Sequence, residues 1–103
     1  MEKLIVAEIV VTPIGTAKTG LSDYIAKAVD EVKKAGVKYH LHPMGTVFEV
    51  SDLETAFRIM KAAHRAVIEA GAKRVLTTLR VDERLDRPRT MEERIKRVEE
   101  KIG

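Results

Sequence analysis

The sequence contains no cysteine, no tryptophan and only two tyrosines and two phenylalanines among its 103 residues. The lack of cysteine excludes a disulfide framework, a thiolate metal site and a cysteine nucleophile, and it fits a reducing compartment. No apolar run approaches the roughly 20 residues that span a bilayer. The first eleven residues are too short and too interrupted for a signal peptide. We therefore expect a cytoplasmic protein without a membrane partner.

Motifs for common catalytic chemistry are also missing. The GxxxxGK[ST] phosphate loop, the HExxH zinc motif and a dinucleotide-binding fingerprint do not occur in the chain. No Ser-His-Asp pattern stands at a recognisable motif, although such triads are defined in space rather than in sequence. The chain is accordingly expected to be a non-enzymatic protein without a cofactor.

The length fits a single domain over residues 1–103. Apolar residues make up 45% of the chain, enough for one core, but so short a chain buries a modest share of its surface and would gain from oligomerisation. The Lys/Arg/Glu-rich composition is common in thermophile proteins. The net charge is +3, and six of the nine arginines lie in the last quarter, which predicts a solvated face or a subunit contact there.

Hydrophobic spacing predicts seven secondary-structure elements. β-Branched residues predict a central strand over 3–12, and 3.6-residue spacing predicts helices. In order, we expect a strand at 3–12, a loop to residue 20, a helix at 21–35, a hairpin of 37–42 and 46–50, a helix from the capping box at 51–54 to Gly71, a strand at 73–82 and a helix from the capping box at 90–93. The stripe of the second helix is expected to include Leu53, Phe57 and His64.

This β-α-β-β-α-β order predicts an α+β fold: a ferredoxin-like sandwich with an antiparallel sheet, plus an extra C-terminal helix. Right-handed crossovers put the first and third strands in the middle and both main helices on one face. The other, open face should carry every second strand residue. Those residues are Val6, Glu8, Val10, Thr12, His40, His42, Val47, Glu49, Leu76, Thr78 and Arg80. Its apolar members invite a second copy, and its polar members could line a pocket at that junction.

Several stretches, in this order and spacing, resemble the thiamine-binding family of small YkoF-like proteins. They are Ala7-Glu8, Pro13-Ile14-Gly15-Thr16, Tyr39, Met44-Gly45-Thr46, Ala63-His64, Gly71 to Arg74, Thr77-Thr78 and Val81 to Asp86. The resemblance implies ferredoxin-like domains in a homodimer or homotetramer, some of which bind thiamine or its pyrimidine. This chain has one copy of the domain, so a two-domain pocket would need two subunits.

The expected partner is thus a small molecule, thiamine or a similar aminopyrimidine, rather than a nucleic acid. The residues expected to contact it are Glu8, Thr16, Tyr39, His40, Gly45, Thr46, Glu49, Thr78 and Arg80. Glu8 and Arg80 have a structural alternative, in which they form an ion pair with each other. In the functional interpretation, the Glu8 carboxylate accepts a hydrogen bond from an aminopyrimidine or balances the charge of a thiazolium. The glycine–threonine pairs at 15–16 and 45–46 offer backbone N–H groups and hydroxyls, or are simple turns.

Three further interpretations compete with this one. For Glu49 and His40, a cross-strand pair is the structural alternative to contact with a ligand. With His42 they could instead bind zinc or another divalent metal, as a metal-binding protein or a metal-dependent enzyme. RNA binding is disfavoured because the only aromatic residue of the central strands, Phe48, is assigned to the helix side. His64 is interpreted as a hydrogen-bonded core residue.

Overall fold

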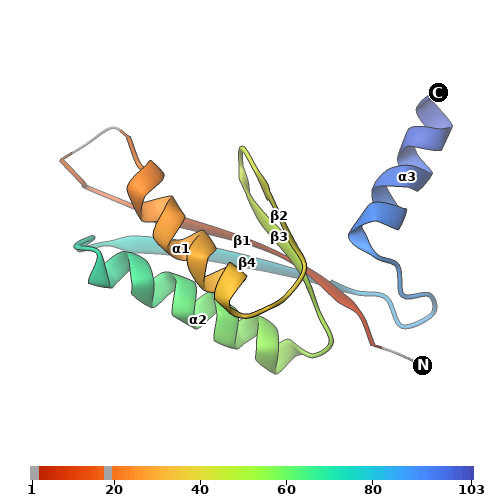
Figure 1. The fold of residues 1–103 in the computed structure, drawn as a ribbon, viewed down its shortest axis with the longest axis horizontal. Coiled ribbons are helices and arrows are strands. Elements are labelled where there is room, and N and C mark those ends of the chain that lie inside the picture. Colours follow the sequence, from red (N-terminus) through yellow and green to blue (C-terminus); the bar gives the residue numbers. More distant parts are fainter. Residues whose placement is uncertain (1–2, 18–19) are drawn as a thin grey trace.

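The computed structural model describes residues 3–17 and 20–103, which form one antiparallel sheet, two helices on one of its faces and a third helix beyond its end (Figure 1). The elements are β1 (Ile5–Pro13), α1 (Ser22–Lys34), β2 (Tyr39–His42), β3 (Gly45–Val50), α2 (Leu53–Glu69), β4 (Val75–Glu83) and α3 (Met91–Ile102). The sheet order is β2-β3-β1-β4. This confirms the predicted ferredoxin-like fold with β1 and β3 in the middle. The predicted loop to residue 20 includes residues 18 and 19, which lie outside the described part.

Capping boxes were predicted at the starts of α2 and α3, and the structure confirms only the one at α3. The capping box predicted at 51–54 is wrong, because Asp52 is the N-cap of α2 and its Oδ1 accepts from the Thr55 N–H at 2.7 Å. Aspartate and serine are about equally good N-caps, so the pattern allowed a one-residue shift. The box at 90–93 is confirmed: Thr90 Oγ1 accepts from the Glu93 N–H, and the Glu93 side chain accepts from the Thr90 N–H.

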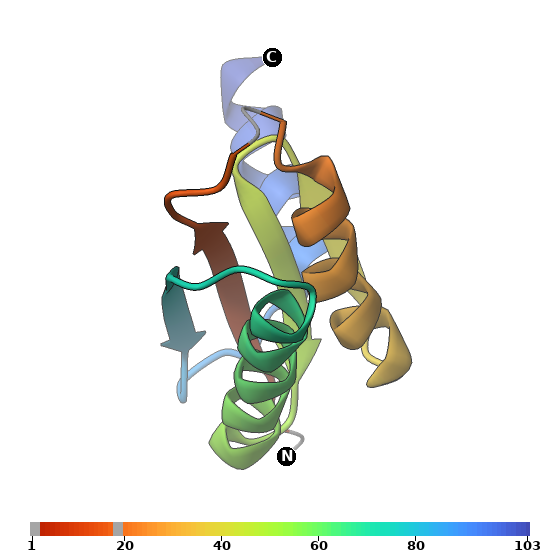
Figure 2. The same cartoon turned by 90° about the vertical axis from the view of Figure 1, so that its left-hand side faces the viewer.

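The core lies between the sheet and the helices. Alternate residues of β1, from Ile5 to Val11, are buried toward the helices, and Phe48 of β3 is fully buried beside them. Figure 2 shows α1 and α2 lying along this same face. The buried residues of α2 are Ala56, Ile59, Ala63 and Val67. The predicted stripe was therefore rotated: Phe57 and Leu53 are exposed, because the small alanine side is the one that packs closely on the sheet.

The open face carries cross-strand rows that the alternation predicted. One row runs Arg80–Glu8–Val47–His40. Next to it, Thr78 lies opposite Val10 and His42 lies opposite Gly45, and Gly45 is close to the Val10 side chain. Neither α1 nor α2 covers these rows, and α3 touches only one end of the face (Figure 1). No helix within the described ranges is long and apolar enough to cross a bilayer.

His64 lies on the covered side, where it joins α2 to β4. It is half-buried, and its Nδ1 lies 2.7 Å from the Thr77 hydroxyl. A half-buried hydrogen bond of this kind stabilises the fold. Removing one of its two groups destabilises the fold by more than the bond contributed, because the other group is left without a partner.

We expect His64→Ala to lower the free energy of unfolding by about 1–3 kcal/mol, because it removes packing and strands the Thr77 hydroxyl. Urea denaturation measures this, with exposed Arg65→Ala as the neighbouring control. In a double-mutant cycle, Thr77→Val should recover part of the loss. Equal stability of wild type and His64→Ala would contradict the structural role.

Candidate functional site

An apolar cavity of about 200 Å³ lies between α1, the far end of β1 and the tip of the β2–β3 hairpin. Its walls are mostly aliphatic: Ile9 and Val11 from β1, Leu21 before α1, Ile25, Ala28, Val29 and Val32 from α1, and Leu41 and Met44 from the hairpin. Such a space favours a flat apolar group over a hydrated ion.

Gly45 allows the hairpin tip to approach β1 this closely. Its backbone does not need a positive φ. A Cβ at this position would instead lie 3.1 Å from Val10 Cγ2 and 3.2 Å from the Ile9 carbonyl oxygen. Gly45 therefore has a packing role, because a side chain there would push β3 away from β1. That its backbone contacts a ligand stays a prediction.

Thr46 supplies a polar group inside the cavity. The residue is only 3% exposed, and its hydroxyl makes no hydrogen bond to any residue that the structure describes. A hydroxyl can both donate and accept. No fully buried polar side-chain atom of the described residues lacks a hydrogen-bond partner, so the Thr46 hydroxyl keeps some exposure, and a ligand in the cavity can bond to it.

His42 forms the link between the cavity and the open sheet face. Its Nε2 lies 3.1 Å from Glu8 Oε2, and its Nδ1 accepts from the Met44 N–H at 3.3 Å. Together these partners define the neutral tautomer with the proton on Nε2, donating to the carboxylate. With both nitrogens engaged, His42 can offer a ligand its ring face.

Glu8 lies behind His42 on the open face and does not line the cavity. Its Oε1 lies 2.9 Å from Arg80 Nη2 and accepts from Arg80 Nε at 3.1 Å. The alternative in which Glu8 pairs with Arg80 is therefore what the structure shows. The carboxylate is half-buried, and the Arg80 guanidinium together with the His42 N–H offsets its loss of hydration.

The predicted pair of His40 with Glu49 is wrong. His40 Nε2 lies 3.1 Å from Glu92 Oε1, and Glu49 accepts from the Met91 N–H at 2.7 Å. Both partners belong to α3, whose first turn returns to the end of the hairpin, a long-range contact that strand alternation does not reveal.

The metal alternative built on His40, His42 and Glu49 also fails in geometry. Each of the three has a different partner, and the described part of the chain holds no group of three or more such side chains placed to share a metal ion.

The remaining predicted contacts do not converge on one point. Tyr39 is opposite Phe48 and packs against the core, on the helix side of the sheet. Thr78 is exposed on the open face, next to Val10. Thr16 is half-buried in the loop after β1. The sequence missed the cavity wall contributed by α1, although the apolar spacing of Leu21, Ile25 and Val29 was a visible signal.

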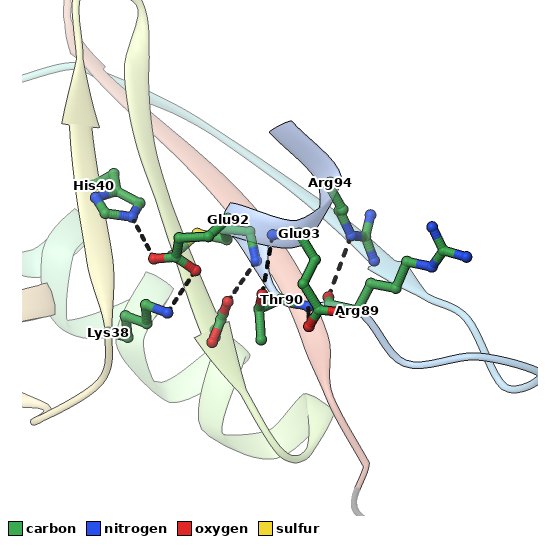
Figure 3. Close-up of polar contacts among 9 residues, drawn as sticks. Lys38, His40, Arg89, Thr90, Glu92, Glu93 and Arg94 are labelled. Atoms are coloured by element: carbon green, nitrogen blue, oxygen red, sulfur yellow. Dashed lines mark hydrogen bonds and ion pairs between the residues drawn. The ribbon is translucent and has the colours of Figure 1, made fainter. Parts of the chain in front are cut away.

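Four side chains fasten α3 to the hairpin, and we name them the α3 clasp: Lys38, His40, Glu49 and Glu92 (Figure 3). Lys38 Nζ donates to Glu92 Oε2 at 2.5 Å. That hydrogen bond, with a backbone N–H and His40, lowers the pKa of Glu92 from 4.5 to about 2. Glu49 accepts at the start of α3, where the helix dipole favours negative charge.

Comparisons with known proteins agree with this architecture. A family model described as "Thiamine-binding protein" matches residues 7–99. A UPF0045 protein of Methanothermobacter thermautotrophicus is 46% identical over 96% of this chain and all of its own length. A crystal structure of a hypothetical protein from Methanocaldococcus jannaschii superposes with a TM-score of 0.86 at 35% identity, covering 97% of this chain and 99% of that one. A Thermotoga maritima protein, provisionally described as acting in thiamine biosynthesis or salvage, has a TM-score of 0.78 at 25% identity, covering 92% and 98%.

The α3 clasp should depend on pH. Because the pKa of Glu92 is lower in the folded chain than its ordinary 4.5, its stabilising effect is present above pH 4.5 and is lost as the pH falls toward 2. We expect the amide protection factors of α3 to fall over this interval. NMR hydrogen exchange measures them, with Glu92→Gln expected to be weakly protected throughout and Glu99→Gln to behave as wild type. Flat protection in wild type would contradict the clasp.

Proposed function

The chain belongs to the thiamine-binding protein family, and we propose that it binds thiamine or a related aminopyrimidine, without transforming it, at a subunit junction of a homo-oligomer. The observation that carries the proposal is the apolar cavity at the hairpin tip, with the unengaged Thr46 hydroxyl inside it. An aminopyrimidine is planar and offers both a hydrogen-bond donor and an acceptor. The Thr46 hydroxyl can accept from the donor or donate to the acceptor.

The size of the cavity suggests which part of thiamine enters. Its 200 Å³ lies below the about 300–1,000 Å³ of pockets for drug-sized ligands. One substituted ring fits such a space, so the pyrimidine goes in and the thiazolium stays at the open side. The His42 ring face is available there for stacking against a heteroaromatic ring.

The thiazolium carries a permanent positive charge, and the carboxylate connected to the cavity is that of Glu8. It acts through His42, which it holds at 3.1 Å, and it shares its charge with Arg80. We therefore assign Glu8 and His42 as positioning residues for the cationic half. Of the nine residues expected to contact the ligand, Gly45 and Thr46 line the cavity.

Binding without catalysis is supported by what lines the cavity. Its titratable side chain is His42, and both nitrogens of that ring already have partners. General acid–base chemistry needs a group that can exchange a proton with the ligand. RNA recognition finds no support either, because Phe48 is fully buried under the helices.

A subunit junction is supported by apolar side chains left in water. Leu41 and Met44 at the cavity rim are exposed, Met44 by 79%, and so are Leu76 on the open face and Ile95 and Val98 on α3. Burying apolar surface stabilises by roughly 25 cal/mol per Å². A second copy of the chain that covers the rim would also enclose the half of the ligand that stays outside the cavity.

Titration calorimetry with thiamine tests the site. We expect Thr46→Val to raise the Kd roughly fivefold, because the variant keeps the shape but loses a hydrogen bond of about 1 kcal/mol. Thr78→Val is the matched control: it removes a hydroxyl from the open face that does not line the cavity, and it should bind as wild type. The Kd of the free aminopyrimidine should rise by the same factor in Thr46→Val.

Two outcomes would count against the proposal. No heat with thiamine at millimolar concentration in wild type would contradict the ligand. A loss in Thr78→Val with none in Thr46→Val would move the site to the open face of the sheet.

Light scattering tests the junction. We expect wild type to be a dimer or a tetramer at micromolar concentration, and Met44→Glu to shift it toward smaller species, because a charge at the rim must lose its hydration on association. Thiamine affinity should fall with the oligomer. Lys61→Glu, on the exposed side of α2, is the control. A monomeric wild type would contradict this part of the proposal.

A further inference from the structure

A second hollow, of about 320 Å³, lies between the end of β4, the following loop and α3, and it shares no lining residue with the cavity. Positive side chains dominate its wall. Asp82 is the one acidic residue that lines the hollow. The five basic residues that line it are Arg84, Arg89, Arg94, Arg97 and Lys101.

Two of these five cations are already neutralised. Arg94 forms an ion pair with Asp82, and its Nε also donates to the Arg89 carbonyl oxygen. Arg84 binds Asp86 with two parallel hydrogen bonds of 2.9 and 3.2 Å. Arg94 and Arg84 are thereby fixed as the frame of the hollow.

The other three cations have no ion pair with any residue that the structure describes. Arg97 and Lys101 are four residues apart on α3, so they share one face of the helix. Figure 3 shows Arg89 extending to the side of α3 away from Lys38 and His40. Partial burial and the charges of Arg97, Arg87 and Arg84 lower the pKa of Arg89.

Local structure accounts for one of the three. Lys101 in the last turn of α3 is favoured there by the helix dipole. No such term applies to Arg89, which precedes the helix, or to Arg97 in its middle. Like charges gathered in a concave site repel one another in the free chain, and a bound anion would relieve that repulsion.

We propose that this hollow is a second ligand site, for a small phosphorylated anion held by Arg89, Arg97 and Lys101. A guanidinium presents parallel N–H donors that match two phosphate oxygens, and an ammonium adds a point charge. The site is independent of the proposed thiamine site. A small anion fits better than a nucleic acid, because the hollow contains no aromatic side chain for base stacking, and Glu92, Glu93, Glu99 and Glu100 on α3 would repel an extended polyanion.

The test uses inorganic pyrophosphate and the full chain. Calorimetry measures the Kd and thermal melts measure the Tm, and sodium chloride at the same ionic strength is the control. We expect saturable binding that raises the Tm, and at least a tenfold weaker Kd in Arg97→Met, which changes an exposed helix position and should fold. Arg89→Met/Arg97→Met should abolish binding. Arg65→Met removes one positive charge from α2 and should bind as wild type.

Four results would overturn the proposal. Pyrophosphate acting no better than chloride, or equal losses in Arg65→Met and Arg97→Met, would reduce the effect to net charge. Tighter binding of a single-stranded oligonucleotide than of pyrophosphate would replace the small anion. Arginine variants that lose the wild-type oligomer without losing pyrophosphate would make the hollow a subunit contact. Thiamine affinity, measured in the same variants, should not change, so this inference and the thiamine proposal can fail separately.

Discussion

The central strand β1 has to satisfy two environments at once, because α1 and α2 cover only one face of the sheet. On the covered face, every second residue from Ile5 to Val11 is aliphatic and buried. On the open face the same strand presents Glu8, flanked by valines, and the carboxylate is half-buried without a helix above it. Its charge is compatible with this position because Arg80 and His42 reach it from opposite sides across the sheet.

This arrangement connects the open face to the cavity. His42 cannot turn freely, since Glu8 and the Met44 N–H hold its two nitrogens. Its ring therefore stays at the hairpin tip, where Gly45 brings β3 against β1 and Thr46 lies under α1. The hydrogen bonds of His42 to Glu8 and to the Met44 N–H therefore fix the position of the imidazole ring in the cavity wall.

The third helix plays a different part. Its first turn is tied down by its own capping box and by the α3 clasp, while the aliphatic side chains further along it are exposed. A helix of 12 residues is marginal by itself in water, so its position depends on these few polar contacts and on the buried Met91 side chain at its start. The same return of the chain gathers the arginines of the second hollow. The proposed subunit contact and the proposed anion site would then be linked to the clasp through one short helix.

Sequence alone determined the features that depend on local period. Two-residue alternation assigned β1, β3 and β4 to their faces, and turn and cap residues placed most element ends within two residues of where they lie. From these, the fold and the sheet order followed, and Glu8 and Arg80 were placed on the same face of neighbouring strands. Whether the Glu8 carboxylate pairs with Arg80 or contacts a ligand stayed open, and the structure shows the pair. Helical phase was less certain, since Leu53 and Phe57 matched a 3.6-residue stripe that the sheet did not bury.

Only the tertiary structure decided the contacts of His40, His42 and Glu49. Their partners lie 34 to 52 residues away along the chain, on another strand or at the start of α3. The cavity has the same origin: α1 and the hairpin tip each show an ordinary apolar pattern, and the space between them exists because Ala28 and Gly45 face it with little or no side chain. Periodicity is local and reports which way a residue points. Which residue it meets depends on how the chain returns, and that is determined by the packing of the whole fold.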